Sequence, residues 1–361
     1  MDLLAQDWER FLPRSHDESW RCPLAAAFAG QDIFVTGAGG YLGSALVKTL
    51  AAEAPRSLIL LDSSEHNLFE LQRYMDRAYP SVSCQAILGS VEDGALLDDI
   101  FSRLRPQILF HAAAFKHVAL LERNLFSAVR NNAVGSYTLA KAARRHGGAK
   151  LVLISTDKAV HPHSAMGVSK RVAELMMLSV SGPGCSVNAI RLGNVIGSSG
   201  SVVPLLLEQI EKGQSMTVTH PEASRYFLSR EEAVTAILAA GIAKEEANIL
   251  LPQFREPVRI AELAAFLARG RTPVCFTGLR PGEKLTEDLV AGDETQVGII
   301  DGPLTVIKSR RLSGAESDRI VENLSECIAS RNAAGLLQIL SSLVPEYVPS
   351  RLVLASVAAA F

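Results

Sequence analysis

Short, nearly continuous apolar runs alternate with longer amphipathic stretches over the first half of the chain. The runs occupy residues 33–35, 58–61, 86–88, 108–111, 151–154 and 187–192. The stretches between them have helical spacing; after Gly43, for example, Leu46, Val47 and Leu50 fall on one side of a helix. Apolar runs of this length that are separated by helices are typical of parallel strands buried on both faces. The pattern therefore predicts an α/β fold with a central parallel sheet.

The alternation loosens after about residue 193, which predicts a second, smaller lobe. We expect helices at residues 204–212, 231–243 and 329–347, and short extended segments at residues 216–220 and 224–228. The expected organisation is an N-terminal arm over residues 1–30 that holds Trp8 and Trp20, a nucleotide-binding domain over residues 31–193 with strands returning up to about residue 250, a mainly substrate-binding lobe over residues 194–350, and a tail over residues 351–361.

The composition disfavours several classes of protein. The net charge is −2, with 20% charged and 48% apolar residues, so neither a nucleic acid nor an anionic membrane is an expected partner. The five cysteines are scattered without a C-x-x-C pair, which disfavours a metal site and a disulfide framework and fits a reducing cytoplasm. We find no signal peptide and no apolar run near the roughly 18 residues of a membrane span, so we expect neither insertion nor export.

A glycine-rich turn follows the first predicted strand. It contains Gly37, Gly40 and Gly43, with Tyr41 and Leu42 between them, and an apolar helix begins there. Glycines permit a tight turn and let backbone N–H groups approach a pyrophosphate at the helix N-terminus. A glycine triplet alone is a weak signal, but this one has the required place between a strand and a helix. We interpret it as a dinucleotide site; a purely structural turn is the alternative.

Other residues at the ends of the predicted strands complete this cofactor site. Asp62 lies about 20 residues after the turn, where a carboxylate binds the adenosine ribose and repels a 2′-phosphate, so NAD is favoured over NADP. Ser90 and Val91 follow the third strand and are predicted to lie near the adenine. The small residues Ala112, Ala113 and Ala114 follow the fourth strand, where they let the backbone pass close to the cofactor.

Charged residues come next in the chain. Lys116, His117 and Glu122 follow a buried strand at the ligand edge of the sheet, which indicates substrate contact, and Lys116 would also lie near the cofactor. Solvated loop charges are the alternative. Asn132 lies in a helix predicted over residues 127–145, and we interpret it as a structural residue beside the cofactor that holds loop backbone.

The densest polar cluster follows the fifth strand. Thr156, Asp157 and Lys158 supply a hydroxyl, a carboxylate and an amine in succession. A helix from about residue 166 places Met166 and Lys170 on one face, at i and i+4. Ligands of open α/β sheets bind at the carboxyl ends of the strands. We therefore interpret these five residues as the catalytic cluster.

Later loops offer groups suited to a phosphorylated substrate. The loop over residues 191–201 is rich in hydroxyls and backbone N–H groups, and the turn over residues 276–284 combines cations with a carboxylate. Arginine matches a diphosphate and glutamate matches sugar hydroxyls. The expected substrate contacts are Asn194, Ser201, Val202, Arg225, Arg280 and Glu283, besides Lys116 and His117. Ordinary surface turns are the alternative.

Taken together, the glycine triplet, Asp62, AAAFKHV, STDKAV and MGVSK resemble the extended short-chain dehydrogenase/reductase superfamily. More closely, the chain is similar to the UDP-N-acetylglucosamine 4,6-dehydratase group of polysaccharide biosynthesis proteins, through RLGNVIGSSGSVVPL, TVTHPEASRYFL, GLRPGEKLTEDL and LVPEYVP. The similarity runs from about residue 30 to residue 350. It implies a Rossmann-type doubly wound parallel sheet with a smaller C-terminal α/β substrate lobe, tightly bound NAD, a UDP-sugar substrate and a homo-oligomer.

The chain departs from the pattern of that group in four places. Met166 stands where the superfamily usually has a catalytic tyrosine; a branch of the dehydratases that retains configuration at C5 is known for methionine here, which implies that branch. Ser90 replaces an adenine-contacting aspartate. Tyr41 and Ala45 replace serine and glutamate beside the glycine turn, and residues 253–255 read Gln-Phe-Arg in place of Asp-Met-Gly. Residues 1–20 faintly resemble the linker to a membrane anchor in longer relatives, which implies a soluble, stand-alone form.

The resemblance also implies a mechanism. The sugar is oxidised at C4, loses water from C5 and C6, and receives the hydride back at C6. Asp157 is the expected acid at the C6 oxygen and Lys158 the C5 base, while Thr156 would bond the 4-hydroxyl and Lys170 the nicotinamide ribose. To act at neutral pH, Lys158 would have to be desolvated or lie near another cation, such as Lys116 or Lys170. The acceptor of the 4-hydroxyl proton stays open, with Asp157 acting through a water as the candidate.

Three other functions compete with this one. A UDP-hexose 4-epimerase needs no elimination pair, so Asp157 and Lys158 speak against it. A 5,6-dehydratase would stop before the hydride returns. A non-catalytic sensor of nucleotide sugars or NAD is favoured only by Met166.

Overall fold

A computed structural model gives the fold and describes residue 8 and residues 27–358, apart from residues 245–246, 255 and 301–303. The predicted N-terminal arm, with Trp20, therefore lies almost entirely outside the described residues. Trp8 is described, and its ring centroid lies 6.0 Å from that of Phe266.

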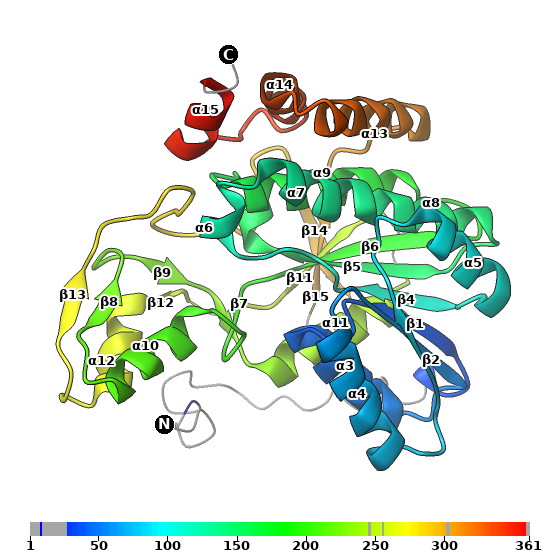
Figure 1. The fold of residues 1–361 in the computed structure, drawn as a ribbon, viewed down its shortest axis with the longest axis horizontal. Helices are drawn as coiled ribbons and strands as arrows, with labels where there is room; N and C mark the ends of the chain where they lie inside the picture. The colour runs from blue at the N-terminus through cyan, green and yellow to red at the C-terminus, as the bar shows by residue number, and fades with distance from the viewer. Residues whose placement is uncertain (1–7, 9–26, 245–246, 255, 301–303, 359–361) are drawn as a thin grey trace.

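A nine-stranded sheet forms the centre of the molecule, in the order β14-β15-β11-β6-β5-β4-β1-β2-β3 (Figure 1). The strands are β1 (Asp32–Thr36), β2 (Ser57–Asp62), β3 (Ser83–Leu88), β4 (Ile108–His111), β5 (Lys150–Thr156), β6 (Ser186–Leu192), β11 (Ile249–Pro252), β14 (Thr295–Ile300) and β15 (Leu304–Lys308). The strands from β3 to β11 are parallel, whereas β15 and β14 are antiparallel. The predicted doubly wound parallel sheet is confirmed, and all six predicted runs are strands.

Helices cover both faces of the sheet (Figure 1). One face carries α3 (Tyr41–Ala52), α4 (Glu65–Ala78) and α11 (Arg230–Ile242). The other carries α5 (Gly94–Leu104), α7 (Leu125–Val129), α8 (Ser136–Arg145) and α9 (Ala165–Ser179). Apolar side chains such as Leu46 and Ile237 on the first face, and Leu139 and Met176 on the second, are fully buried against the strands. Because both faces are covered, the central strands need the continuous apolar runs seen in the sequence.

The helix predicted over residues 127–145 is present but irregular. A π-helical turn, Arg130–Gly135, separates α7 from α8. It contains Asn131 and Asn132, whose side chains are buried and bonded to each other. A wider turn of this kind is often found at a functional site, and here it aims Asn132 at the segment that follows β4.

The smaller lobe has its own core. It contains β8 (Met216–Val218), β9 (Ser224–Arg225), β12 (Val258–Arg259) and β13 (Val274–Phe276), with α10 (Val202–Glu211) and α12 (Ile260–Ala268). Two short strands pair in parallel beside it: β7 (Asn194–Val195) precedes α10 in the chain, and β10 (Phe227–Leu228) follows β9 and leads into α11. Val203, Leu206, Met216 and Leu263 are almost fully buried in this core. Figure 1 shows the lobe beside the carboxyl ends of the sheet strands.

The C-terminal region differs from the prediction. Helices α13 (Gly314–Ala329), α14 (Ala333–Leu343) and α15 (Arg351–Ala358) lie over α9 as an outer layer (Figure 1). The predicted bounds of the helix over residues 329–347 are wrong. A short non-helical turn, Ser330–Asn332, separates α13 from α14, and α14 ends at Leu343. The expected tail over residues 351–361 is largely helical. Since β14 and β15 also join the sheet, the lobe ends well before residue 350.

A fully buried cluster of four charges joins α9, β6 and the segment before β14. Arg191 Nη2 donates to Glu174 Oε2 over 2.8 Å, and Arg191 Nη1 donates to Glu294 Oε2 over 2.7 Å. Arg171 lies 3.1 Å from Glu174 and 3.0 Å from Glu294. Ser155, at the end of β5, also donates to Glu174 over 2.6 Å. Each buried charge therefore has a partner of opposite sign, as burial requires.

We predict that Glu294→Gln lowers the free energy of unfolding by about 3–5 kcal/mol, because it leaves part of a buried arginine pair uncompensated. Burial alone would raise the pKa of Glu294, but hydrogen bonds and charge from Arg191 bring it to about 2. The wild-type contribution is therefore present above the unfolded pKa near ~4.3 and lost as pH falls toward 2. Urea unfolding at several pH values measures both effects.

The control for this prediction is Asp99→Asn, which breaks an exposed pair with Arg103. Exposed pairs contribute about 1 kcal/mol or less, so this variant should unfold almost like the wild type. An equal decrease in the free energy of unfolding in the two variants would contradict the prediction that the buried cluster stabilises the fold more than an exposed ion pair does.

Candidate active site

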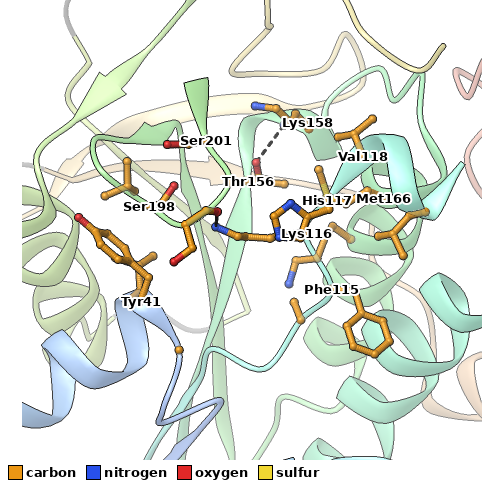
Figure 2. A pocket seen from close by; sticks show the side chains of 18 of the residues that line it. Tyr41, Phe115, Lys116, His117, Val118, Thr156, Lys158, Met166, Ser198 and Ser201 are labelled. Carbon is orange, nitrogen blue, oxygen red and sulfur yellow. Dashed lines mark hydrogen bonds between the residues drawn. The ribbon is translucent and has the colours of Figure 1, made fainter. Parts of the chain in front are cut away.

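A cavity of about 1030 Å³ lies at the carboxyl ends of β1, β4, β5 and β6. Its walls come from the glycine turn, the segment after β4, the end of β5, the start of α9, the loop after β6 and the turn near Arg280. Figure 2 shows Tyr41 on one side of this space and Thr156, Lys158 and Met166 on the other. A second hollow of about 170 Å³ adjoins the glycine turn near Asp62.

The structure brings most of the predicted site residues together. The larger cavity is lined by Gly37, Gly40, Tyr41, Leu42, Gly43, Ala112, Ala114, Lys116, His117, Thr156, Lys158, Met166, Lys170, Asn194, Ser201, Arg280 and Glu283. The smaller hollow is lined by Asp62, Ser90, Val91 and Ala113, and shares some residues of the turn. Asn132, Asp157, Val202 and Arg225 line neither space.

The glycine turn brings the N-terminus of α3 to the cavity. Gly37 has φ +65°, and a Cβ there would lie 2.6 Å from the backbone nitrogen of Ala113. A Cβ at Gly43 would lie 2.0 Å from the carbonyl oxygen of Gly37. Gly40, the N-cap of α3, has no side chain to bond the first N–H groups of the helix. The helix therefore begins at the cavity wall without a side-chain cap, and such a helix start, with the positive end of its dipole, is suited to bind an anion.

Asp62 ends β2 beside this turn and is nearly buried. Its Oδ2 accepts from the Gly39 N–H over 2.8 Å, and its Oδ1 accepts from the Ser64 N–H over 2.8 Å. The backbone therefore fixes the carboxylate at the edge of the smaller hollow. Each oxygen keeps a lone pair that could accept a further hydroxyl.

The segment after β4 is fixed by hydrogen bonds from Asn132 and contacts the opposite wall of the cavity through Lys116. Asn132 donates to the carbonyl of Phe115 over 2.9 Å and accepts from its N–H over 2.8 Å, which is the backbone-holding role expected from the sequence. Lys116 Nζ donates to the carbonyl of Ser199 over 2.7 Å, across the cavity, and burial lowers the pKa of Lys116. The His117 ring lies against Gly200, in the loop that contains Ser199, so that a Cβ at Gly200 would lie 2.5 Å from it.

Thr156, Asp157 and Lys158 form a connected group where β5 ends. Asp157 Oδ1 accepts from Thr156 Oγ1 over 2.9 Å and from Lys158 Nζ over 2.9 Å. Lys158 Nζ also donates to Asn194 Oδ1 over 3.0 Å, in the loop after β6. Thr156 and Lys158 face the cavity, whereas the Asp157 side chain is fully buried behind them. The expectation that Asp157 touches the sugar directly is therefore not met.

The charge of Lys158 also differs from the expectation. Burial would lower its pKa, but the carboxylates of Asp157 and of Glu287, 3.7 Å away, outweigh burial and hold it above the usual lysine value. The cation that acts on Lys158 is Arg225, in place of the expected Lys116 or Lys170. In this arrangement Lys158 rests as an ammonium.

Lys170 has the opposite environment. Its Nζ donates to the carbonyl of Ile154 over 2.8 Å, and burial lowers its pKa to about 8, with Glu174 opposing the shift. Met166 lies one turn earlier on α9 and is nearly buried at the cavity wall. Its thioether cannot take up a proton at neutral pH. Burial thus lowers the pKa of Lys170, as it does that of Lys116, and Met166 contributes only apolar surface to the cavity.

Two predicted ligand contacts have structural roles instead. Arg225 is buried and donates to the carbonyls of Ser224, Lys284 and Leu285 over 2.7–3.0 Å. Glu122 is buried, and its Oε1 accepts from the Ala165 N–H over 2.7 Å, at the N-terminus of α9. A carboxylate there stabilises the positive end of the helix that carries Met166 and Lys170.

Glu287 is a site residue that the sequence did not single out. It lies within the motif GLRPGEKLTEDL, which pointed to the substrate through Arg280 and Glu283. A second carboxylate near Lys158 comes from a segment more than a hundred residues away, so no local pattern could pair them. Within the described ranges we find no cluster of potential metal ligands and no helix long and apolar enough to span a membrane.

Comparison with known proteins shows which family the chain resembles. Residues 33–305 match the family described as polysaccharide biosynthesis protein. The chain is 34% identical over 310 residues to the capsular polysaccharide biosynthesis protein CapD of Staphylococcus aureus, covering 83% of this chain and 52% of the relative. It is 37% identical over 301 residues to the probable polysaccharide biosynthesis protein EpsC of Bacillus subtilis, covering 81% and 50%. The chain thus spans about half the length of these curated relatives.

More distant similarities concern other enzymes on this fold. A UDP-glucose 4-epimerase of Rickettsia massiliae is 29% identical, with 74% of this chain and 80% of the relative covered. A dTDP-glucose 4,6-dehydratase of Streptomyces venezuelae, DesIV, solved with NAD, superposes with a TM-score of 0.62 at 21% identity, covering 72% of this chain and 88% of that one. At this identity the likeness of the solved structure shows the fold alone.

We predict that Gly37→Ala lowers the free energy of unfolding by at least about 2 kcal/mol, because a side chain at positive φ and against the Ala113 backbone is doubly unfavourable. Gly292→Ala is the matched control, since a Cβ there meets nothing within 4 Å and its φ is not in the left-handed region. Urea unfolding of both variants checks the prediction. A Gly37→Ala variant as stable as Gly292→Ala would show that the turn is not as tight as described.

Proposed function

The chain belongs to the polysaccharide biosynthesis protein family, and from this premise we propose that it catalyses the NAD-dependent 4,6-dehydration of a UDP-N-acetylhexosamine, with UDP-N-acetylglucosamine as the expected substrate. The product is a 4-keto-6-deoxy sugar for glycan or polysaccharide biosynthesis. The observation that carries the proposal is the linked group of Thr156, Asp157 and Lys158, which opens on the same cavity as the glycine turn.

The residues around the turn fit a dinucleotide. The uncapped N-terminus of α3 suits the pyrophosphate, Asp62 suits the adenosine ribose, and Ser90 and Val91 border the adenine hollow. Lys170, 2.8 Å from the Ile154 carbonyl, would hold the nicotinamide ribose. The chemistry that NAD supplies when bound is the removal of hydride from sugar C4 and its return at C6.

The structure suggests a route for the 4-hydroxyl proton that needs no water. Thr156 Oγ1 directs its own hydrogen at Asp157, so its lone pairs can accept a hydrogen bond from the substrate. The proton of the 4-hydroxyl then passes to Thr156 while the threonine proton passes to Asp157. Because Met166 cannot accept this proton, we assign the relay to Thr156 and the final acceptor to Asp157.

The elimination uses the proton that Asp157 has taken up from the 4-hydroxyl. Once Asp157 is neutral, one of the two carboxylates that hold Lys158 as an ammonium is gone, and the partly exposed Lys158 can release a proton to solvent in the cavity. The neutral amine then removes the C5 proton, which the C4 ketone has acidified. Asp157 returns its proton through Thr156 to the departing C6 hydroxyl, which leaves as water, and Lys158 gives a proton back to C5 when hydride returns to C6.

The remaining cavity residues would bind the nucleotide sugar. Figure 2 shows Lys116 and His117 together in the middle of the cavity, with Ser201 apart from them on another segment of its wall. Arg280 and Glu283 line its outer part, where a diphosphate and sugar hydroxyls would meet them. We therefore propose that the diphosphate lies toward the lobe and the hexose toward Lys158.

Incubation with UDP-N-acetylglucosamine tests the function. We expect the mass of the product to fall by one water and its NMR spectrum to show a ketone at C4 and a methyl group at C6. A product of unchanged mass would mean a 4-epimerase, and one with a 5,6 double bond would mean a 5,6-dehydratase. Tightly bound NAD without turnover on any UDP-sugar would mean a sensor. Each of these three results contradicts the proposal.

We predict that Lys158→Ala leaves C4 oxidation detectable but stops the entry of solvent deuterium at C5, because the variant lacks the C5 base. Absorbance of the reduced nicotinamide reports the first step, and NMR of substrate recovered from deuterated water reports the second. Lys212→Ala removes an exposed lysine and should match the wild type in both. Full exchange at C5 in the Lys158 variant would refute the role of this amine.

A further inference from the structure

We infer that Glu287 is a positioning residue that holds the Lys158 amine at the cavity and sets its protonation. This inference rests on the proposed function. Glu287 follows the turn that carries Arg280 and Glu283, and only 7% of its surface is exposed. Its Oε1 lies 3.7 Å from Lys158 Nζ and comes from a chain segment remote in sequence from the one that carries Asp157.

The Glu287 carboxylate lies close to three cations. Glu287 Oε2 lies 3.2 Å from Lys284 Nζ, and its Oε1 lies 3.6 Å from Arg225 Nε as well as near Lys158. The other acidic partner of Lys158 is Asp157, 2.9 Å away on its own turn. Two buried carboxylates and the half-exposed Asp288, which contacts Lys284, thus balance three cations, so removal of Glu287 would leave Lys158, Arg225 and Lys284 with excess positive charge.

The segment that carries Glu287 is fixed at both ends. On one side, Arg225 donates to the carbonyls of Lys284 and Leu285, while Lys284 Nζ donates to the Val160 carbonyl over 3.0 Å. On the other side, Arg191 donates to the Leu289 carbonyl over 3.2 Å and belongs to the buried charge cluster. Glu287 therefore cannot follow Lys158 if that side chain moves, and instead defines where the amine rests.

Other titratable groups nearby act on this cluster more weakly. Asp288 is half exposed and contacts His161 and Lys284. His163, in the loop before α9, is influenced by Lys284, Glu287 and Asp288. Tyr226 is influenced by Asp157 and Asp288. Of these, only Asp288 carries a permanent negative charge at neutral pH, and its contacts are with groups other than Lys158.

The experiment compares Glu287→Gln, Glu287→Asp and Asp288→Asn. Asp288→Asn is the matched control, because it removes the same charge one residue further on without touching Lys158. The readout is competitive labelling of Lys158 by acetic anhydride across a pH series, followed by mass spectrometry. Labelling follows the neutral fraction of the amine and needs no turnover, so it is independent of the proposed reaction.

We expect Glu287→Gln to label Lys158 about tenfold faster than the wild type at neutral pH, since loss of a nearby opposite charge lowers a lysine pKa by about one unit or more. Glu287→Asp should fall between the two, because a shorter side chain draws the charge away, and it serves as the test if the glutamine variant does not fold. Asp288→Asn should match the wild type.

The pH profile of deuterium exchange at C5 provides the second readout. In Glu287→Gln its acidic limb should move to lower pH, because Lys158 loses its proton more readily, whatever happens to the maximal rate. Wild-type labelling in the glutamine and aspartate variants would overturn the inference while leaving the proposed function intact. Faster labelling in a chain whose wild type does not dehydrate UDP-sugars would support the role of Glu287 in setting this charge and defeat the proposed function alone.

Discussion

The site depends on one ammonium held between two buried carboxylates. Lys158 extends from the end of β5, Asp157 lies beneath it, and Glu287 approaches from the segment that returns from the lobe. A third contact, to Asn194, ties the amine to the loop after β6. The same few atoms therefore fix the end of β5, the loop after β6 and the segment that carries Glu287 relative to one another. The buried carboxylates are tolerable there because each lies beside a cation.

Two of the three lysines that line the cavity, Lys158 and Lys170, have opposite environments. Lys170 is buried against a carbonyl oxygen, and its pKa falls to about 8, whereas carboxylates keep the pKa of Lys158 high despite burial. An aspartate that stores the 4-hydroxyl proton and a lysine that loses its own proton once that aspartate is neutral can supply an acid and a base without an additional group. That property would let the site eliminate water although Met166 stands at the usual tyrosine position.

The sequence predicts those features of the fold and the site that depend on residues close together in the chain. Strand β4 and the glycine turn follow from a short apolar run and from residues that must adopt a tight turn. Strand β3 was placed only over its last three residues, because its first half is partly exposed and less apolar. The return of β14 and β15 to the sheet, the pairing of Arg191 with Glu294 and the approach of Glu287 to Lys158 join distant segments, and no local pattern records such pairings. The charge of Lys158 was mispredicted for the same reason.

The measurement that tests this account most directly is the labelling midpoint of Lys158 and Lys170 in the unmodified chain, determined together across one pH series. A midpoint does not depend on how fast reagent reaches each amine, so the two lysines can be compared despite their different burial. The account predicts that Lys170 becomes reactive near pH 8 and that Lys158 does so only above the range of ordinary lysines. The reverse order would contradict it.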